Sequence, residues 1–170
     1  NYQGNTFIWK GSGNLNDLKA EDVFGKEGLL KSVHPNFEYR SQQVNYAEMA
    51  DSILNDKIGV GVAEAGTGLG KSLAYLFGAF KKSIFFEDEG PTVIACNTKH
   101  LQDQLFYKDL PLLAKSINAP IKAVMLKGRN NYICKTRFNW LMNERNKILS
   151  SKDIESILPL IIWLLYTETG

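Results

Sequence analysis

The 170-residue sequence has little of several features that would mark a special class of protein. Its two cysteines, Cys96 and Cys134, are far apart and form no CxxC pair. Two cysteines this far apart are not a disulfide framework, so a reducing, cytoplasmic setting is expected. The longest apolar stretch, near Leu158 to Tyr166, is much shorter than the roughly 20 residues that span a bilayer. No basic segment followed by an apolar one opens the chain, so we expect neither a signal peptide nor contact with a membrane.

The chain also has little net charge, +2, but the charge is unevenly distributed. Residues 1–90 carry nine basic and twelve acidic side chains, whereas residues 91–170 carry eleven basic and six acidic ones. Seven basic residues lie between Lys122 and Lys147, interleaved with aromatic ones and opposed by Glu144 alone. This pattern suits single-stranded nucleic acid. A solvated helix face with aromatic residues in the core would give the same composition, and both readings stay open here.

Short apolar runs alternate with segments of helical periodicity. The predicted elements, in chain order, are a β-like run at Thr6–Trp9, a helix over 41–55, a strand over 58–63, a helix over 71–86, a strand over 92–96, a helix over 98–116 with Pro111 as a candidate break, a strand over 121–126, and a last apolar helix that begins at Leu158 with Pro159 in its first turn. This alternation predicts an α/β fold with a parallel sheet flanked by helices.

A glycine-rich segment between a predicted strand and a predicted helix is the strongest functional signal. It reads Ala65, Gly66, Thr67, Gly68, Leu69, Gly70, Lys71, Ser72. Glycines let the backbone turn tightly and aim its N–H groups at phosphate oxygens, and the helix N-terminus adds a favourable dipole. Lys71 would place a positive charge against the β- and γ-phosphates, and the Ser72 hydroxyl would be a ligand of Mg²⁺. We therefore predict a nucleotide triphosphate site with Lys71 and Ser72 as its catalytic residues.

Two details qualify this motif. The strict pattern has glycine at the first position, where this chain has Ala65. Hydrolysis would also need an acidic second motif, and the acidic run at Glu87–Glu89 directly precedes Gly90 and Pro91. We interpret that run as a solvated loop, so the sequence offers no convincing acidic partner for hydrolysis.

The loop and its surroundings resemble the DinG/XPD-type superfamily-two DNA helicases, which usually have alanine at the position of Ala65. Four more segments occur in the family's order: Phe37 to Gln43, Asn97 to Leu105, Leu126 to Cys134, and Trp163 with Thr167 to Gly170. The resemblance covers roughly residues 24–170. It implies a P-loop NTPase fold of RecA type, incomplete in this chain. The segment Lys127 to Cys134 is its most specific part.

The resemblance also assigns roles to individual residues. Arg40 and Gln43 match the pair that reads the adenine side of ATP, with Tyr46 where the family often has methionine. The residues that the resemblance implies in contacts with single-stranded DNA are Thr98, Lys99, Gln102, Lys127 and Arg129. Thr98 and Gln102 are neutral donors, which can hold phosphates without reading bases. A helix-capping role for Thr98 is the simpler alternative.

Cys134 matches the family's first iron–sulfur ligand. A four-iron cluster needs four thiolates, and Cys96 is interpreted as a core residue. We therefore expect a 4Fe–4S cluster in the parent protein but not in this chain. The implied organisation is an N-terminal extension at 1–23, the first part of RecA-like motor domain 1 at 24–126, and the start of the iron–sulfur insertion, mostly helical, at 127–170.

The resemblance implies an ATP-dependent helicase that moves 5′→3′ on single-stranded DNA, with DNA repair as the usual setting. This chain would hold ATP and Mg²⁺ but would need the missing remainder of the helicase chain for activity. Two other functions stay open. A small P-loop kinase would use Arg129, Arg137 and Arg145 as a lid, and a non-catalytic nucleic-acid binding module would use the basic stretch.

Overall fold

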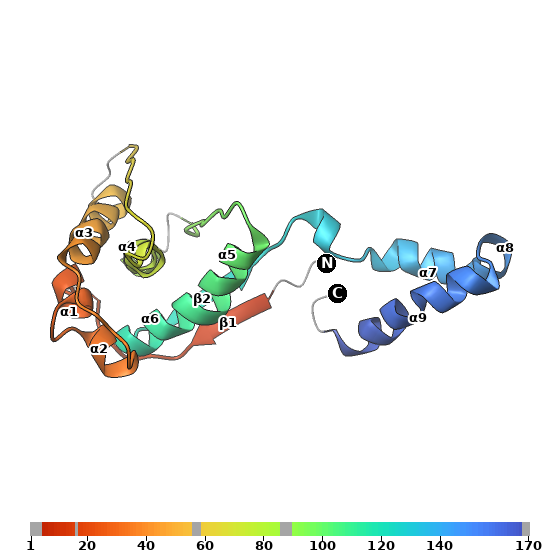
Figure 1. Ribbon diagram of the computed structural model, residues 1–170, viewed down its shortest axis with the longest axis horizontal. Helices are drawn as coiled ribbons and strands as arrows, with labels where there is room; N and C mark the ends of the chain where they lie inside the picture. Colours follow the sequence, from red (N-terminus) through yellow and green to blue (C-terminus); the bar gives the residue numbers. More distant parts are fainter. Residues whose placement is uncertain (1–4, 16, 56–58, 86–89, 168–170) are drawn as a thin grey trace. The chain divides into compact units, whose positions relative to one another are not determined.

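The computed structural model describes residues 5–15, 17–55, 59–85 and 90–167. The chain divides into two compact units, Phe7–Ala123 and a second unit formed by Val124–Gly170 with the first six residues. This division lies close to the predicted boundary between 126 and 127. The elements of the first unit and of the sheet are β1 (Asn5–Trp9), α1 (Ala20–Phe24), α2 (Leu29–Val33), α3 (Ser41–Asn55), α4 (Lys71–Phe85), α5 (Lys99–Gln104), a π-helical turn (Leu105–Asp109), α6 (Leu110–Ile117) and β2 (Ile121–Met125) (Figure 1).

Helices α3 and α4 pack against each other at the centre of the first unit. Their contact is close at Gly78, where a Cβ atom would lie 3.1 Å from the Ala50 carbonyl oxygen. Phe77 of α4 is fully buried and meets Phe24 of α1 edge to face, with 5.8 Å between the ring centroids. The predicted helix over 41–55 is therefore confirmed, and the one over 71–86 is confirmed as far as Phe85.

A half-buried ion pair links the same two helices. Lys81 Nζ lies 2.6 Å from Asp51 Oδ2, and the two side chains are only 16% and 21% exposed. Asn55 Nδ2 donates to Asp51 Oδ1 at 2.6 Å and to the Gly78 carbonyl at 3.3 Å. Because both charges have lost much of their water, the geometry of this pair matters more than that of a surface pair. The pair fixes how α3 lies along α4.

The predicted helix over 98–116 is continuous but changes its pitch in the middle. Thr98 caps its start, since the Leu101 amide donates to the Thr98 hydroxyl at 3.2 Å. Pro111 has no amide hydrogen to donate, and the chain passes it through the π-helical turn, in which the Leu110 amide bonds to the Leu105 carbonyl. Pro111 therefore reshapes the helix rather than breaking it. The turn buries Asp109.

The sheet differs from the prediction. The described residues contain one sheet, in which β1 and β2 pair antiparallel. Strand 121–126 is thus confirmed up to Met125, and the β-like run at Thr6–Trp9 pairs with it. Segments 59–63 and 92–96 have no regular secondary structure and form no ladder among the described residues, and Ile58 lies outside them. Val60, Val62 and Val93 are 84%, 92% and 82% exposed. A strand needs a hydrogen-bonded neighbour, so the predicted parallel sheet is not formed here.

The second unit contains a 3₁₀ turn (Arg129–Asn131), α7 (Lys135–Asn143), α8 (Arg145–Ile148) and α9 (Ser151–Tyr166). Helix α9 begins seven residues before the predicted start at Leu158, so Pro159 lies inside the helix instead of in its first turn. A capping box explains the early start: the Ser150 hydroxyl accepts from the Asp153 amide at 3.2 Å, and Asp153 Oδ2 accepts from the Ser150 amide at 2.9 Å. None of the helices in the described part of the chain has the length and apolarity needed to cross a membrane.

Candidate nucleotide site

The glycine-rich loop connects segment 59–64 to the first turn of α4. Gly68 and Gly70 adopt positive φ angles of 81° and 84°, which side chains with a Cβ rarely take. A Cβ on Gly70 would also collide with the side-chain amide of Gln43. By contrast, nothing lies within 4 Å of where a Cβ would be at Gly66 and Gly68, so the loop is open on that side. An anion can therefore approach the backbone here.

Lys71 is folded over the loop. Its Nζ donates to the carbonyl oxygens of Ala65 at 2.6 Å and Gly66 at 2.7 Å. The ammonium group is thus held where the loop meets the N-terminus of α4, beside the amides that a helix end leaves free. This set of donors fits a phosphate group: one fixed cation, backbone N–H groups and the positive end of a helix dipole.

Arg40 and Gln43 both reach the loop from the start of α3. Arg40 Nη1 donates to the Gly68 carbonyl at 2.6 Å, and Arg40 Nη2 pairs with Glu38 Oε2 at 2.7 Å. Gln43 is buried, and its Nε2 donates to the Gly70 carbonyl at 3.2 Å. The structure therefore brings both residues to the predicted loop, although they are 28 and 27 positions away from their partners.

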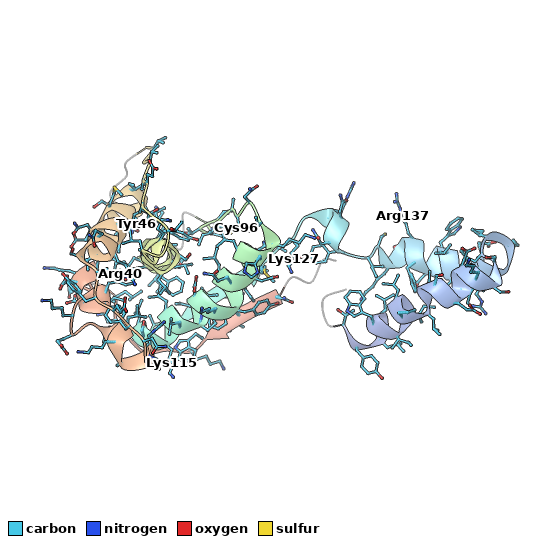
Figure 2. The ribbon with its side chains drawn as sticks, viewed as in Figure 1. Arg40, Tyr46, Cys96, Lys115, Lys127 and Arg137 are labelled. Atoms are coloured by element: carbon cyan, nitrogen blue, oxygen red, sulfur yellow. The ribbon has the colours of Figure 1, made fainter. Side chains whose placement is uncertain are left out.

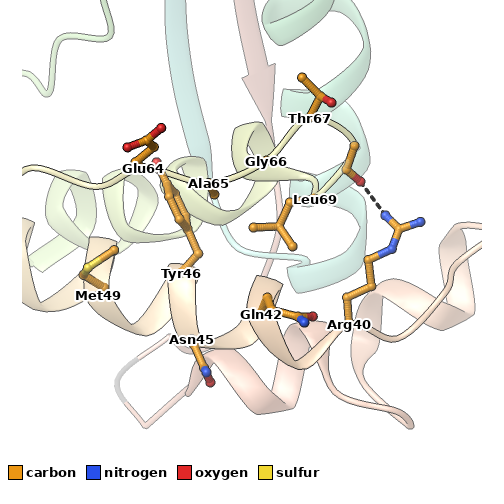
Figure 3. A pocket seen from close by; sticks show the side chains of 11 residues that line it. Arg40, Gln42, Asn45, Tyr46, Met49, Glu64, Ala65, Gly66, Thr67 and Leu69 are labelled. Carbon is orange, nitrogen blue, oxygen red and sulfur yellow. Dashed lines mark hydrogen bonds between the residues drawn. The ribbon is translucent and has the colours of Figure 1, made fainter.

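A pocket of about 790 Å³ lies beside the loop (Figure 3). Its lining residues are Arg40, Gln42, Asn45, Tyr46, Met49, Glu64, Ala65, Gly66, Thr67, Gly68 and Leu69. One wall is a face of α3 that offers two amides, a ring and a thioether. Figure 2 shows Arg40 and Tyr46 near the start of this helix. Sequence reasoning missed Gln42, Asn45 and Met49. Their helical spacing is visible in the sequence, but it has no meaning until the loop is placed against α3.

The Ser72 hydroxyl faces two further groups, Tyr75 and Asp109. Burial raises the pKa of the Asp109 carboxyl, and hydrogen bonds from Gln104 and Ser72 partly offset this. Gln104 Nε2 lies 3.2 Å from Asp109 Oδ2. Burial also raises the pKa of the Tyr75 phenol, which shares a hydrogen bond with Ser72. No local pattern points to Asp109, because the π-helical turn that carries it is far from the glycine-rich loop in the sequence.

The residues predicted to contact DNA fall in both units. Thr98 and Lys99 are exposed at the start of α5, where the Thr98 hydroxyl serves as the helix cap, and Gln102 is half-buried. Lys127 and Arg129 belong to the second unit, around its 3₁₀ turn. Cys134 is exposed immediately before α7, whereas Cys96 packs partly buried against the core. The acidic run at Glu87–Glu89 lies outside the described residues.

The chain is 34% identical over 150 residues to ATP-dependent DNA helicase YoaA of Haemophilus influenzae, covering 88% of this chain and 22% of the relative. It is 33% identical over 161 residues to 3'-5' exonuclease DinG of Staphylococcus haemolyticus, covering 94% of this chain and 16% of that protein. A Bacillus subtilis protein, 3'-5' exonuclease DinG, is 30% identical over 149 residues, covering 86% of this chain and 15% of its own. No family model matches the chain, and no solved structure matches it.

One of these relatives is named as an ATP-dependent DNA helicase and two as 3'-5' exonucleases. The chain belongs to the DinG-type family of helicases, in agreement with the resemblance that its motifs carry. It spans less than a quarter of the length of each of the three relatives described above.

Proposed function

We propose that this chain is the ATP-binding part of an ATP-dependent DNA helicase of the DinG type. The observation that carries the proposal is the joint arrangement of three features: the open glycine loop, the Lys71 ammonium beside it, and the adjoining pocket on α3. Together these features suit the two portions of one ligand. The loop and Lys71 suit the phosphates, and the pocket suits a base.

The phosphates would lie along the loop from Gly66 to Gly70, at the N-terminus of α4. The Ser72 hydroxyl is the group that would hold Mg²⁺, an ion that bridges and neutralises phosphate oxygens when it is bound. Lys71 would exchange the carbonyls of Ala65 and Gly66 for phosphate oxygens, which bind an ammonium more strongly because they are charged.

The exposed valines support a RecA-like parallel sheet in the whole protein. Segments 59–63 and 92–96 are rich in apolar and β-branched residues, yet Val60, Val62 and Val93 face solvent. Short apolar runs of this composition are typical of strands buried between layers of helices. We propose that further strands, from the part of the relatives that this chain does not span, pair with these segments.

DNA would be bound through phosphate contacts. The exposed polar residues Thr98 and Lys99 and the basic residues Lys127 and Arg129 are suited to neutral or cationic contacts with a backbone. Movement 5′→3′ on single-stranded DNA and a role in cytoplasmic DNA repair complete the proposal. Cys134 would be a ligand of a 4Fe–4S cluster in the whole protein only, since the chain has two cysteines and the cluster needs four thiolates.

A nucleotide titration tests the proposal. The full chain, its Lys71→Ala variant and a matched Lys115→Ala variant are titrated with a fluorescent ATP analogue and Mg²⁺. Lys115 is exposed on α6 and contributes nothing to the loop (Figure 2). We expect Lys71→Ala to weaken binding by about 10- to 100-fold, the equivalent of one charge-assisted contact, and Lys115→Ala to leave it unchanged. Failure of the unaltered chain to bind, or equal binding by Lys71→Ala, would refute the ATP site.

A second measurement concerns hydrolysis. Because the sequence shows no acidic hydrolysis motif, we expect no DNA-stimulated ATP turnover from these 170 residues alone. Steady-state phosphate release with and without single-stranded DNA decides this. Stimulated turnover would contradict the assignment of the chain as a motor part that needs the remainder of the protein.

A further inference from the structure

A buried carboxyl group lies behind the glycine-rich loop, on the π-helical turn. Asp109 is only 6% exposed. Its side chain caps no backbone amide of α6, the helix that follows it, so the local structure of its own segment does not account for it. Because a buried carboxyl group is costly unless it has hydrogen-bond partners, the partners that Asp109 does have explain its place in the structure.

The partners of Asp109 come from two other elements. Gln104, the last residue of α5, donates from Nε2 to Asp109 Oδ2 at 3.2 Å. The Ser72 hydroxyl, in the first turn of α4, makes a second hydrogen bond with the same carboxyl group. The π-helical turn and α6 both pack against α4, and this packing brings Asp109 to the end of the glycine-rich loop. Turns of this kind are often found at functional sites.

The bond between Ser72 and Asp109 has a defined direction. A hydroxyl group has one proton and two lone pairs, whereas an ionised carboxyl group can only accept. Ser72 is therefore the donor, and its oxygen keeps lone pairs for a cation. A hydroxyl ligand of Mg²⁺ needs this state, because the ion binds oxygen atoms. The donor set at Ser72 thus fits the ion that a bound nucleotide would bring.

Tyr75, three residues further along α4, also shares a hydrogen bond with Ser72. A phenol can donate as well as accept, so Tyr75 does not decide where the Ser72 proton points. A carboxylate does decide it, because it has no proton to offer. Of the two neighbours of the Ser72 hydroxyl, Asp109 is therefore the one that can orient it.

We propose that Asp109 is a positioning residue for Ser72, whose proton it accepts so that the hydroxyl oxygen stays free to hold the Mg²⁺ of a bound Mg–ATP. Gln104 in turn holds the Asp109 carboxyl group. The inference rests on the proposed ATP site and on Ser72 as its Mg²⁺ ligand. It gives that ligand an acidic partner from a segment distant from the loop in the sequence.

The experiment measures how much Mg²⁺ strengthens nucleotide binding. Dissociation constants of a fluorescent ATP analogue are determined for the full chain with Mg²⁺ and with EDTA, and their ratio is the Mg²⁺ factor. Asp109→Asn keeps the shape of the side chain but replaces one acceptor oxygen with an NH₂ donor. We expect it to reduce the Mg²⁺ factor by about tenfold, the usual cost of removing a group that orients a metal ligand. Binding in EDTA should stay the same.

A double variant tests whether Asp109 acts through Ser72. Ser72→Ala removes the hydroxyl and should lower the Mg²⁺ factor at least as much as Asp109→Asn. Once the hydroxyl is gone, Asp109 has nothing to orient, so Ser72→Ala/Asp109→Asn should lose no more than Ser72→Ala alone. Losses that multiply in the double variant would overturn the proposal. So would an Asp109→Asn variant that keeps the full Mg²⁺ factor.

Two further variants separate positioning from a fold defect. Asp51→Asn removes a half-buried carboxylate that pairs with Lys81 between α3 and α4. It should leave the Mg²⁺ factor unchanged even where it lowers stability. Gln104→Met alters an exposed side chain and should lower the factor, by less than Asp109→Asn does. A drop in Asp51→Asn as large as that in Asp109→Asn would contradict the proposal, since it would show a general effect of stability.

The unaltered chain distinguishes two kinds of failure. Equal binding of the ATP analogue with Mg²⁺ and with EDTA would overturn the inference about Asp109 and Ser72 and leave the ATP site in place. Absence of binding under both conditions would instead refute the ATP site itself.

Discussion

The units 7–123 and 124–167 are held together in different ways. The first has a core of fully buried side chains, with Phe24 and Phe77 at its centre and a half-buried ion pair between α3 and α4. In the second unit, α7 and α9 have no buried residue, and Trp140 and Trp163 are 60% and 45% exposed. Its contacts include local ones, such as the Ser150 capping box and the Glu144–Lys147 pair.

The two units also carry different candidate functional residues. Every residue of the candidate nucleotide site comes from the unit with the core, because a phosphate loop must be held in one conformation to present its amides. Lys127, Arg129 and Cys134 come from the unit that relies on local bonds. Helices without a buried face gain most of their stability only from partners that cover them. The two units should therefore respond differently to the same kind of change.

The largest effect should come from Phe77→Ala. Phe77 is fully buried, so its loss should lower the free energy of unfolding by about 3–5 kcal/mol through lost burial and the cavity left behind. Trp163→Ala in α9 is the control and should change the stability of unit 7–123 very little. Urea unfolding followed by hydrogen exchange of the α3 and α4 amides measures both. Equal losses in the two variants would remove the distinction between the units.

Pro159→Ala should act in the opposite direction and only in the second unit. Proline inside a helix costs about 3 kcal/mol relative to alanine, since it lacks an amide and clashes with the preceding turn. The substitution should therefore raise the helical circular dichroism signal and slow amide exchange in α9. Amide exchange of α3 and α4 should stay the same. A shift there would mean that α9 supports the first unit.

Asp51→Asn tests the ion pair of the first unit. It leaves Lys81 without its charged partner in a half-buried position, and we expect a loss of about 2 kcal/mol. Glu27→Gln is the control: it breaks a pair with Lys31 that is well exposed, and such pairs contribute only about 0.3–0.5 kcal/mol. Thermal unfolding at one pH measures both. A similar small effect of each would show that burial of the pair is unimportant.

The smallest effect concerns pH and the cap of α9. Hydrogen bonds from Ser150 hold the pKa of Asp153 below its usual value of 3.8. A lowered pKa in the folded state stabilises the helix above pH 3.8, and this contribution is lost as the pH falls through the lowered value. Amide exchange at the start of α9 should therefore increase in acid. Ser150→Ala should remove that pH dependence, and an unchanged profile in the variant would exclude the cap as its source.

Local signals in the sequence predicted much of this structure. The helix 41–55 has its observed bounds because helical periodicity is a property of neighbouring residues, and strand 121–126 ends one residue early. Segments 59–63 and 92–96 were predicted as strands and are not, because pairing depends on a partner that no local pattern reveals. Helix α9 begins before the predicted start at Leu158, because the Ser150–Asp153 capping box sets its first turn and Pro159 lies inside the helix.

The candidate nucleotide site also has one part that a local pattern predicts and one part that depends on tertiary packing. The loop from Ala65 to Ser72 was found because its glycine spacing encodes backbone geometry. The pocket residues Gln42 and Asn45, and the Asp109 carboxyl near Ser72, depend on how distant segments pack. The sequence therefore predicted a phosphate site at this loop but gave no sign of the pocket beside it. The roles of Lys71, Ser72, Arg40 and Gln43 stay predictions.

The exposed valines at 60, 62 and 93 have a practical consequence for handling the polypeptide. Uncovered β-branched side chains on segments that form no ladder among the described residues favour contact with another molecule, and a net charge of +2 provides little repulsion to prevent it. The isolated 170 residues should therefore self-associate as their concentration rises, through these two segments. Substituting Val60 and Val62 by lysine would improve solubility without touching the loop, since both side chains point into water.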